Sequence, residues 1–421
     1  MDFSEKIERE LSWRGLYKES ANFNSLNEII KLKSKFYVGV DPTASSLHIG
    51  HYVFIVVSKL IYDITKMTPV FVIGGLTGQI GDPSGKQSER NLISEEIIKS
   101  NVKQISKQLS LLAKNIGIEN FEIFNNMDVY KNMSIVKLFQ KFGKLFNLKE
   151  MIAKDMVKNR LDNGLSYTEF SYQVFQAIDF LTLFEKKNVR FQIGGSDQWG
   201  NITSGIELIR KIKGVRSSVS GLTINLLLDE NNNKIGKTGG NAIWLDKNRF
   251  SSFDFYQYLL NISDFLAENL LCKLTLIKKE DFNKIISESK KYPKKKLVQE
   301  KLAKKLLSMI HGENIFEEVK NVSKILFEED YKNISFDDFL KIEKYIGISF
   351  KYENIGIMDF LLKHKMVFSR REFREFINLN AIRINGDIIN DENRKIESTD
   401  FLHKKYIVIN VGKKRKYLIK K

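Results

Sequence analysis

Strand-like and helix-like segments alternate between residues 35 and 250, and this alternation limits the possible folds more than any other feature. Short runs rich in β-branched and aromatic residues are separated by long amphipathic stretches, as expected for strands joined by crossover helices. Such an order favours an α/β fold with a parallel sheet. The predicted strands are Phe36–Val40, Val70–Gly74, Phe121–Phe124, Val189–Ile193 and Leu222–Leu228.

Polar residues follow several of these predicted strands. His48 follows the first strand, Asp82 the second and Asp197 the fourth, and Lys234 lies beyond the last. In an open parallel sheet, ligands bind beyond the carboxyl ends of the strands. The sequence therefore predicts that these side chains share one binding site.

The tetrapeptide His48-Ile49-Gly50-His51 stands at the start of a predicted helix. Two imidazoles one turn apart could bind a phosphate together with the backbone N–H groups and the positive end of the helix dipole. Gly50 would let a flat adenine ring approach the backbone. Two histidines that cap an ordinary loop would look the same. The segment Lys234-Ile235-Gly236-Lys237-Thr238 favours the phosphate interpretation, because it adds two lysines and a hydroxyl.

Two common nucleotide-binding motifs are absent. Gly236-Lys237-Thr238 ends like a Walker A loop, but Asn231 occupies the position where that loop requires its first glycine. No G-x-G-x-x-G segment follows the first predicted strand, which excludes a dinucleotide-dependent dehydrogenase.

The composition limits the partners and the compartment. The chain has 68 Lys and Arg residues against 51 Asp and Glu, a net charge of +17. Such an excess is typical of proteins that bind nucleic acid, although biased codon usage could also produce it. Cys272 is the only cysteine, which excludes intrachain disulfides and fits a reducing, cytoplasmic location. The acidic start lacks a signal core, and no uncharged apolar run is long enough to span a membrane. We therefore expect a soluble protein with no membrane partner.

The remainder of the chain divides by its periodicity. Apolar spacing in Phe255–Leu260 and Leu297–Ile310 predicts helices with a lysine-rich solvated face. The predicted divisions are a sheet domain at 1–250, a helical domain at 251–330, a connector at 331–351 and a small α+β module at 352–421.

The C-terminal module has a predicted helix and a predicted hairpin. Ser369 with Glu372 forms a capping-box pattern before the helix Arg370–Ile377, and Asn385-Gly386 predicts a tight turn. The module also has basic residues that could form a phosphate-binding face or a merely solvated surface: Arg370, Arg371, Arg374, Arg383, Lys413, Lys414, Arg415 and Lys416.

Polar residues lie along one face of a largely apolar helix at Glu169–Phe184. Tyr172, Gln176 and Asp179 stand at i, i+4 and i+7, which places them on the same side. Buried polar groups need hydrogen-bond partners. These partners could be one another, the backbone or a ligand.

Taken together, these residues resemble bacterial-type tyrosyl-tRNA synthetases, which are class I aminoacyl-tRNA synthetases with a Rossmann-like catalytic domain. The C-terminal module is similar to the S4-like RNA-binding domain of that family. The resemblance covers nearly the whole chain and rests on five blocks in the family's order: 37–43, 48–51, 81–86, 194–201 and 234–238.

The resemblance implies that tyrosine and ATP form tyrosyl-adenylate, and that the tyrosyl group then passes to the 3′ end of tRNA(Tyr). ATP would be a co-substrate that brings Mg²⁺, with no metal bound tightly by the protein. The implied catalytic residues are His48, His51, Lys234, Lys237 and Thr238. Tyrosine would contact Tyr37, Asp82, Tyr172, Gln176, Asp179 and Gln198, with its hydroxyl at Asp179 and Tyr37. ATP would contact Asp41, Thr43, Gly50, Gly195, Asp197 and Lys237.

The resemblance also implies contacts outside the reaction site. Lys86 and Arg90 are candidates for assisting pyrophosphate release or loop closure. Residues 125–160 would include a dimer-forming insertion, so we expect a homodimer. The implied tRNA-binding residues are Arg210, Lys211, Arg370, Arg371 and Arg374.

Other functions remain open from the sequence. A tryptophanyl-tRNA synthetase would share the fold and the two segments 48–51 and 234–238. However, Asp179 with Tyr37 favours a phenolic hydroxyl over an indole. A simpler adenylyltransferase would need neither the lysine-containing loop nor a basic C-terminal module. An RNA-binding or splicing-assisting protein would not need intact ATP loops.

Overall fold

The computed structural model describes residues 2–85, 88, 93–162, 164–235, 242–328, 331–346, 349–412 and 415–421. The chain forms two compact units. The first comprises Met1–Asp246 with Ser263–Leu302, and the second comprises Lys247–Ile262 with Ala303–Lys421.

The first unit contains, within its described residues, a six-stranded sheet in the order β1-β6-β5-β2-β3-β4. Strands β2 to β6 run parallel, and β1 pairs antiparallel with β6 at the edge. The predicted parallel sheet is therefore confirmed. The strands are β1 Tyr17–Ala21, β2 Lys35–Val40, β3 Pro69–Ile73, β4 Glu122–Asn125, β5 Val189–Gly195 and β6 Ser220–Ile224.

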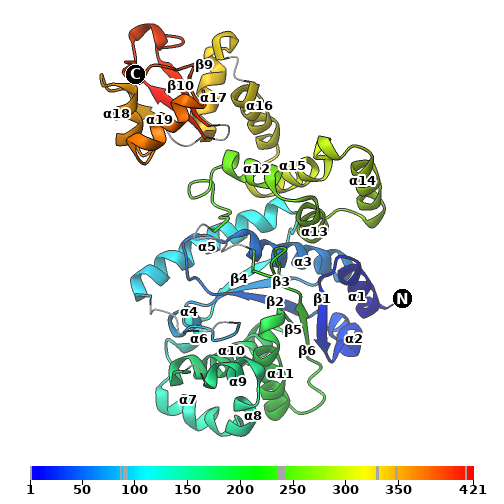
Figure 1. Ribbon diagram of the computed structural model, residues 1–421. Coiled ribbons are helices and arrows are strands. Elements are labelled where there is room, and N and C mark those ends of the chain that lie inside the picture. Colours follow the sequence, from blue (N-terminus) through cyan, green and yellow to red (C-terminus); the bar gives the residue numbers. More distant parts are fainter. Residues whose placement is uncertain are drawn as a thin grey trace. The chain divides into compact units, whose positions relative to one another are not determined.

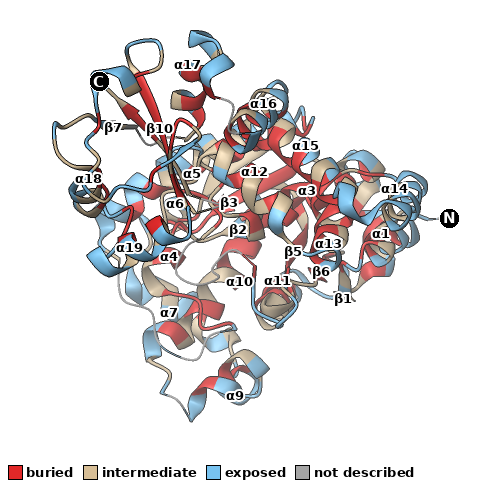
Figure 2. Cartoon of the chain, turned by 45° about the horizontal axis from the view of Figure 1, so that its top comes forward, coloured by how far each residue is buried: buried red, intermediate tan, exposed pale blue. Residues whose placement is uncertain are grey.

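Helices cover both faces of this sheet. In Figure 1, α3 and α5 lie on one side of the strands, and α10 and α11 lie on the other. Buried residues concentrate on the strands and on the inner faces of the helices (Figure 2). The helices of this unit are α1 Phe3–Trp13, α2 Leu26–Lys31, α3 Ile49–Thr65, α4 Thr77–Ile80, α5 Glu95–Asn115, α6 Met127–Tyr130, α7 Ile135–Lys141, α8 Leu148–Ile152, α9 Asp155–Leu161, α10 Tyr167–Lys187, α11 Trp199–Lys213, α13 Asp264–Leu274 and α14 Lys279–Lys291.

The sheet differs from the sequence prediction at two places. Strand β1 has no periodic apolar pattern, because it lies at the sheet edge and its side chains are only partly buried. The last predicted strand, Leu222–Leu228, ends early at Ile224. Leu226 and Leu227 leave the strand and line a cavity instead, so their apolar character reflects the cavity wall.

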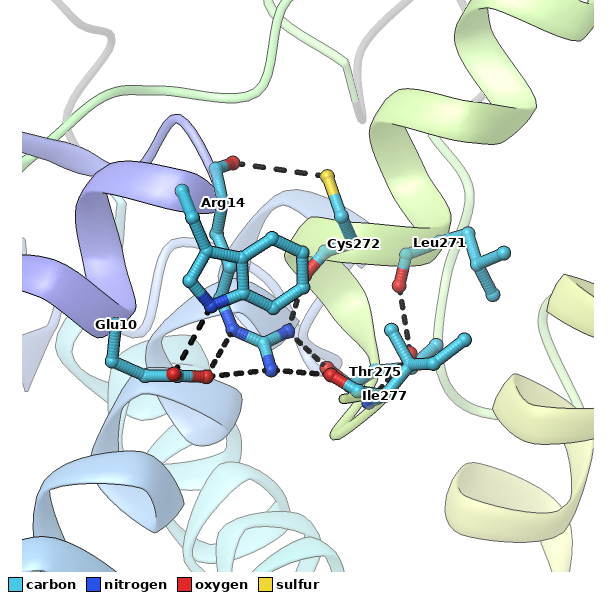
Figure 3. A network of polar contacts seen from close by, with 7 residues as sticks. Glu10, Arg14, Leu271, Cys272, Thr275 and Ile277 are labelled. Atoms are coloured by element: carbon cyan, nitrogen blue, oxygen red, sulfur yellow. Dashed lines mark hydrogen bonds and ion pairs between the residues drawn. The ribbon is translucent and has the colours of Figure 1, made fainter. Parts of the chain in front are cut away.

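A buried arginine explains why α13 packs with the first unit. The Arg14 guanidinium donates to the carbonyl oxygens of Cys272, Thr275 and Ile277 at 2.5, 2.8 and 2.7 Å, as Figure 3 shows. Its Nε also donates to Glu10 Oε1 at 2.9 Å. Carbonyls at the end of a helix lack partners within the helix. Arg14 supplies these partners and joins the end of α13 to α1.

The second unit combines helices with a small sheet. Its described strands form a five-stranded sheet in the order β7-β11-β10-β8-β9. The strands are β7 Ser349–Lys351, β8 Ile382–Ile384, β9 Asp387–Ile388, β10 Tyr406–Val411 and β11 Arg415–Lys420. The helices are α12 Ser252–Asn261, α16 Ile315–Glu328, α17 Phe336–Ile346, α18 Ile357–Lys363 and α19 Arg370–Asn378, and α15 Leu297–His311 runs into this unit from the first.

The predicted helix cap and hairpin of this module are confirmed. The N–H of Glu372 donates to Ser369 Oγ at 3.0 Å, whereas the Glu372 carboxylate accepts from the N–H of Phe368 instead of completing the box at Ser369. Strands β8 and β9 pair antiparallel around Asn385 and Gly386, whose φ values are 48° and 91°. Both positions need a left-handed backbone, which these two residues adopt readily.

The segment 331–351 is not an irregular connector. It contains α17, which buries Phe339, Ile342 and Tyr345, and also β7, which pairs parallel with β11. The apolar face of α17 is visible in the sequence, because Phe339, Ile342 and Tyr345 recur at helical spacing, whereas β7 has only three residues and is too short for a pattern. The compact units also cut across the predicted helical domain at 251–330, because α12 and α13 pack in different units. The remaining domain boundaries stay predictions.

Candidate functional site

A cavity of about 560 Å³ lies in the first unit, beyond the carboxyl ends of the parallel strands. Segments that follow β2, β3 and β5 supply much of its wall, together with α3 and α10. The wall includes these residues that the sequence singles out: Tyr37, Asp41, Thr43, His48, Gly50, His51, Asp82, Tyr172, Gln176, Asp179, Gly195, Asp197, Gln198 and Lys234.

A buried carboxylate, Asp179, forms one polar part of the wall. Its Oδ1 accepts from the Tyr130 hydroxyl at 2.8 Å, and its Oδ2 accepts from Asn126 Nδ2 at 2.9 Å. Burial raises the pKa of Asp179 to about 7, although the two hydrogen bonds oppose this shift. The nearby hydroxyl of Tyr37 is also buried and has no hydrogen-bond partner among the described residues. A ligand hydroxyl would provide that partner.

A second carboxylate, Asp41, is held by two hydroxyl groups. Tyr172 donates to Asp41 Oδ2 at 3.0 Å, and Thr77 donates to Asp41 Oδ1 at 2.7 Å. The helix-face residue Tyr172 is thus connected to the loop that follows β2. Gly74 lies against this group, since a Cβ there would stand 2.1 Å from Asp41 Oδ1.

A series of hydrogen bonds leads from α11 to a third carboxylate, Asp82, which is buried. Asn201 Nδ2 donates to Gln198 Oε1 at 3.0 Å, and Gln198 Nε2 donates to Asp82 Oδ2 at 2.6 Å. The N–H of Ser84 donates to Asp82 Oδ1 at 2.9 Å. Burial raises the pKa of Asp82. This series of hydrogen bonds orients both Gln198 and Asp82 in the cavity wall.

The two histidines stand at the start of α3. Gly50 N–H donates to Nδ1 of His48 at 3.1 Å, His48 N–H donates to Nδ1 of His51 at 3.3 Å, and the ring centroids are 3.8 Å apart. A neutral imidazole that accepts at Nδ1 has its proton on Nε2. Both rings therefore have an Nε2–H donor near the positive end of α3, an arrangement suited to a phosphate.

Lys234 reaches the cavity from a chain reversal after β6. Its Nζ lies 2.9 Å from Asp197 Oδ2, and the N–H of Ile235 donates to the Leu227 carbonyl at 2.9 Å. The lysine side chain is 49% exposed, so this ion pair contributes little stability and leaves Lys234 able to engage an anion. A Cβ at Gly50 would lie 2.8 Å from the Ile235 carbonyl oxygen, so glycine also permits this close approach.

Some predicted residues lie outside the described part of the chain. They are Lys86, Arg90, Gly236, Lys237, Thr238, Lys413 and Lys414.

The basic residues predicted to contact tRNA are at the surface and outside the cavity wall. Arg210 donates to Asn22 Oδ1 at 2.7 Å, and Lys211 donates to the Leu145 carbonyl at 2.8 Å. In the second unit, Arg370, Arg371 and Arg374 are exposed and lie near acidic side chains. Exposed ion pairs of this kind are weak, so a polyanion could displace the acidic partners.

Sequence reasoning missed the residues that hold Asp179. Asn126 and Tyr130 follow β4, the third predicted strand, whose carboxyl end points to the same cavity as its neighbours. Polar residues after that strand were the available signal. Asn126 also accepts from the N–H of Leu76 at 2.8 Å, so it is fixed from both sides.

The described residues contain no group of three or more histidine, cysteine, aspartate or glutamate side chains that could hold a metal ion. In the same part of the chain, no helix has both the length and the apolar character needed to cross a membrane.

Comparisons with known proteins agree with this architecture. Residues 31–328 match the family model described as tRNA synthetases class I (W and Y), and residues 342–419 match the Tyrosine--tRNA ligase SYY-like C-terminal domain. The chain therefore belongs to the class I tRNA synthetases of the tryptophan and tyrosine type.

Full-length relatives refine this placement. A tyrosine–tRNA ligase of Oenococcus oeni is 38% identical over 98% of this chain and 99% of its own length. One of Ureaplasma urealyticum is 36% identical over 98% of both chains. These relatives confirm the resemblance to tyrosyl-tRNA synthetases.

Solved structures share the fold. A C-terminally truncated mitochondrial tyrosyl-tRNA synthetase of Aspergillus nidulans has a TM-score of 0.66 and 28% identity, covering 77% of this chain and 97% of its own. A tryptophanyl-tRNA synthetase of Encephalitozoon cuniculi has a TM-score of 0.54 and 15% identity, covering 80% of this chain and 94% of its own, which is a likeness of fold alone.

Proposed function

We propose that this cavity is where the chain, as a tyrosine–tRNA ligase, activates L-tyrosine with ATP before transfer to tRNA(Tyr). The observation that supports this most is the buried carboxylate of Asp179 beside the unpartnered hydroxyl of Tyr37. A phenolic hydroxyl can donate to the first and accept from the second. An indole N–H can only donate, so tryptophan would leave Tyr37 without an acceptor.

The rest of the amino acid fits the remaining wall. Asp82, oriented by Gln198 and Ser84, would bind the ammonium group of tyrosine together with Tyr172 and Gln176. A carboxylate is suited to this role because a hydrogen bond to a charged group is roughly twice as strong as a neutral one. The tyrosine carboxylate would then point toward the segment that follows β5.

Adenylate formation needs positioning and charge stabilisation more than a base. The tyrosine carboxylate attacks the α-phosphorus of ATP, and the bond to the pyrophosphate oxygen breaks. Negative charge grows on the leaving pyrophosphate, where His48, His51, Lys234 and Lys237 would act as donors and Thr238 would add a hydroxyl.

The nucleotide itself would lie between residues 41–51, which follow β2, and the segment that begins at Lys234. Asp41, Thr43 and Gly50 would contact it from the first of these segments. Gly195 and Asp197, which follow β5, would contact it near the ribose. Pairing with Lys234 keeps the Asp197 carboxylate beside the phosphate-binding side chains.

Magnesium would enter with ATP. The wall carboxylates Asp41 and Asp82 already accept hydrogen bonds from protein donors, and Asp197 is paired with Lys234. This arrangement fits an ion held mainly by phosphates and water, which is usual for Mg²⁺. When bound, the ion would neutralise phosphate charge.

Transfer to tRNA would use the exposed basic residues of both units. Arg210 and Lys211 would contact the acceptor stem, and Arg370, Arg371 and Arg374 would contact phosphates elsewhere in the tRNA. The single cysteine fits a reducing compartment, and we place the protein in the cytoplasm.

The chain would act as a homodimer through the insertion at 125–160. Phe142 is buried in the core, and Leu145 and Phe146 pack against that core. Other apolar side chains of the insertion remain exposed on one chain: Ile135, Val136, Phe139, Leu148 and Ile152. These exposed side chains are the apolar surface that a second copy of the chain would cover.

A charging assay tests the proposal. The protein should attach labelled tyrosine to tRNA(Tyr) in an ATP-dependent reaction, and Tyr37→Phe should raise the KM for tyrosine, because the substrate hydroxyl loses a donor. Attachment of tryptophan to tRNA(Trp) instead would contradict it.

A further inference from the structure

Tyr130 contacts the proposed tyrosine site from outside the cavity. It is the last residue of α6 and does not line the cavity, yet its hydroxyl lies 2.8 Å from Asp179 Oδ1 and 2.9 Å from the Phe175 carbonyl oxygen. Its ring also packs edge-on against the Phe175 ring at 5.4 Å. The hydroxyl therefore bridges the cavity carboxylate and the backbone of α10.

We propose that Tyr130 is a positioning residue that holds Asp179 as an oriented anionic acceptor and thereby sets the preference for tyrosine over phenylalanine. This inference rests on the proposed function, since it assigns the Asp179 carboxylate to the substrate hydroxyl.

Orientation follows from the two donors. Tyr130 occupies one oxygen of Asp179 and Asn126 the other, so both carboxylate oxygens are held at fixed positions. Asn126 is tied to other groups as well, because it donates to Thr77 Oγ1 and accepts from the N–H of Leu76. Tyr130 does not line the cavity, so its hydroxyl can be removed with less disturbance of the cavity wall.

The charge of the Asp179 carboxyl group depends on the same two hydrogen bonds. The titratable groups that face Asp179 are Tyr37 and Asp41 from the β2 side and Tyr130 from α6. Burial and the Asp41 carboxylate raise the pKa of Asp179, whereas the hydrogen bonds from Asn126 and Tyr130 lower it. The pKa of about 7 means that the carboxyl group is close to its titration point at neutral pH. Loss of one of these donors would raise the pKa of Asp179 further, so that more of the carboxyl group would be in its neutral form at pH 7.

A neutral Asp179 would serve the substrate poorly. The phenolic hydroxyl would lose a charged acceptor and meet a second donor beside Tyr37. Phenylalanine has no hydroxyl, so it depends much less on the state of Asp179. Removal of the Tyr130 hydroxyl should therefore weaken the binding of tyrosine much more than the binding of phenylalanine.

The matched control is Tyr52→Phe. Tyr52 is a fully buried tyrosine of α3 whose hydroxyl has no hydrogen-bond partner among the described residues and which does not line the cavity. Both variants remove one phenolic oxygen, but only Tyr130→Phe removes a donor to Asp179.

ATP–pyrophosphate exchange with tyrosine and with phenylalanine, from pH 6 to 9, measures the effect. For Tyr130→Phe we expect the KM for tyrosine to rise about tenfold at pH 7 with kcat within about twofold, because a hydrogen bond to a charged group is lost. The acidic limb of kcat/KM should move to higher pH, and the preference for tyrosine over phenylalanine should narrow about tenfold. Tyr52→Phe should match the unmodified enzyme.

Two results would overturn the inference. One is a Tyr130→Phe enzyme with an unchanged KM and pH profile. The other is an equal loss with both amino acids, which would indicate a general structural effect. Failure of the unmodified enzyme to activate tyrosine would instead refute the proposed function, so the two failures are distinguishable.

Discussion

The ionised Asp179 carboxylate should reduce the stability of the folded protein. Its pKa rises from an ordinary value of 3.8 to about 7, so folding opposes ionisation by about three pKa units. Each unit corresponds to about 1.4 kcal/mol, which gives a penalty of about 4 kcal/mol when the group is fully ionised. Replacement by the isosteric, uncharged asparagine should remove much of this penalty.

The Asp179→Asn side chain can be accommodated by the existing contacts. Its carbonyl oxygen would accept from Asn126, and its amide would donate to the Tyr130 oxygen. Tyr130 could then donate to the Phe175 carbonyl, which already lies 2.9 Å away. Asn126 and Tyr130 would therefore both keep a hydrogen-bond partner at residue 179.

The sign of the effect depends on pH. Because the pKa of Asp179 is raised in the folded protein, the penalty is absent below about pH 4, where the group is protonated in both the folded and the unfolded state. The penalty grows as the pH rises and is complete above about pH 7. At pH 8 the variant should therefore be more stable by up to about 4 kcal/mol, and the difference should vanish near pH 4.

Urea unfolding at pH 8, 6 and 4, followed by intrinsic fluorescence, measures these differences. The control is Asp128→Asn, an exposed carboxylate paired with Lys131, which should change the unfolding free energy by less than about 1 kcal/mol. A variant that is less stable at pH 8, or equally stabilised at every pH, would refute the reasoning.

Three other predictions concern activation, assembly and tRNA. Lys237→Ala should slow adenylate formation much more than it weakens tyrosine binding, since charge on pyrophosphate develops toward the transition state; equal effects in pre-steady-state and equilibrium titrations would count against this role. Phe139, which is 51% exposed, should lie in a dimer interface, so ultracentrifugation should show a dimer that Phe139→Glu dissociates; an unmodified monomer at high micromolar concentration would disprove it. Combined replacement of Arg370, Arg371 and Arg374 by alanine should leave exchange unchanged but weaken tRNA binding, with the salt slope reduced by roughly 0.7–0.9 per lost phosphate contact; an unchanged slope would show that these residues are only solvated.

Much of the first unit was predictable because its strands are buried on both faces. Such strands are continuous apolar runs, as in Pro69–Ile73, where every residue is buried. The edge strand Tyr17–Ala21 lacks that signal, because its partner β6 lies about 200 residues away in sequence and only one side of it is paired. Pairing at such a distance leaves no local pattern.

The part of the cavity wall that α10 supplies was predictable, because helical spacing places its polar residues on one face. Tyr172, Gln176 and Asp179 share a helix face, and all three line the cavity. Tyr130 was missed because α6 has only four residues, too few for a periodic pattern. The pairing of Lys234 with Asp197 was missed for another reason, since it depends on the chain reversal that brings Lys234 back to the cavity.

Amino-acid-dependent ATP–pyrophosphate exchange is the most direct test of the central claim. Each of the standard amino acids should be offered in turn to the full-length protein with ATP, Mg²⁺ and labelled pyrophosphate. Tyrosine alone should support rapid exchange, and Asp179→Ala should reduce it by about one to two orders of magnitude through loss of the charged acceptor. Exchange with tryptophan but not tyrosine would contradict the assignment of the cavity.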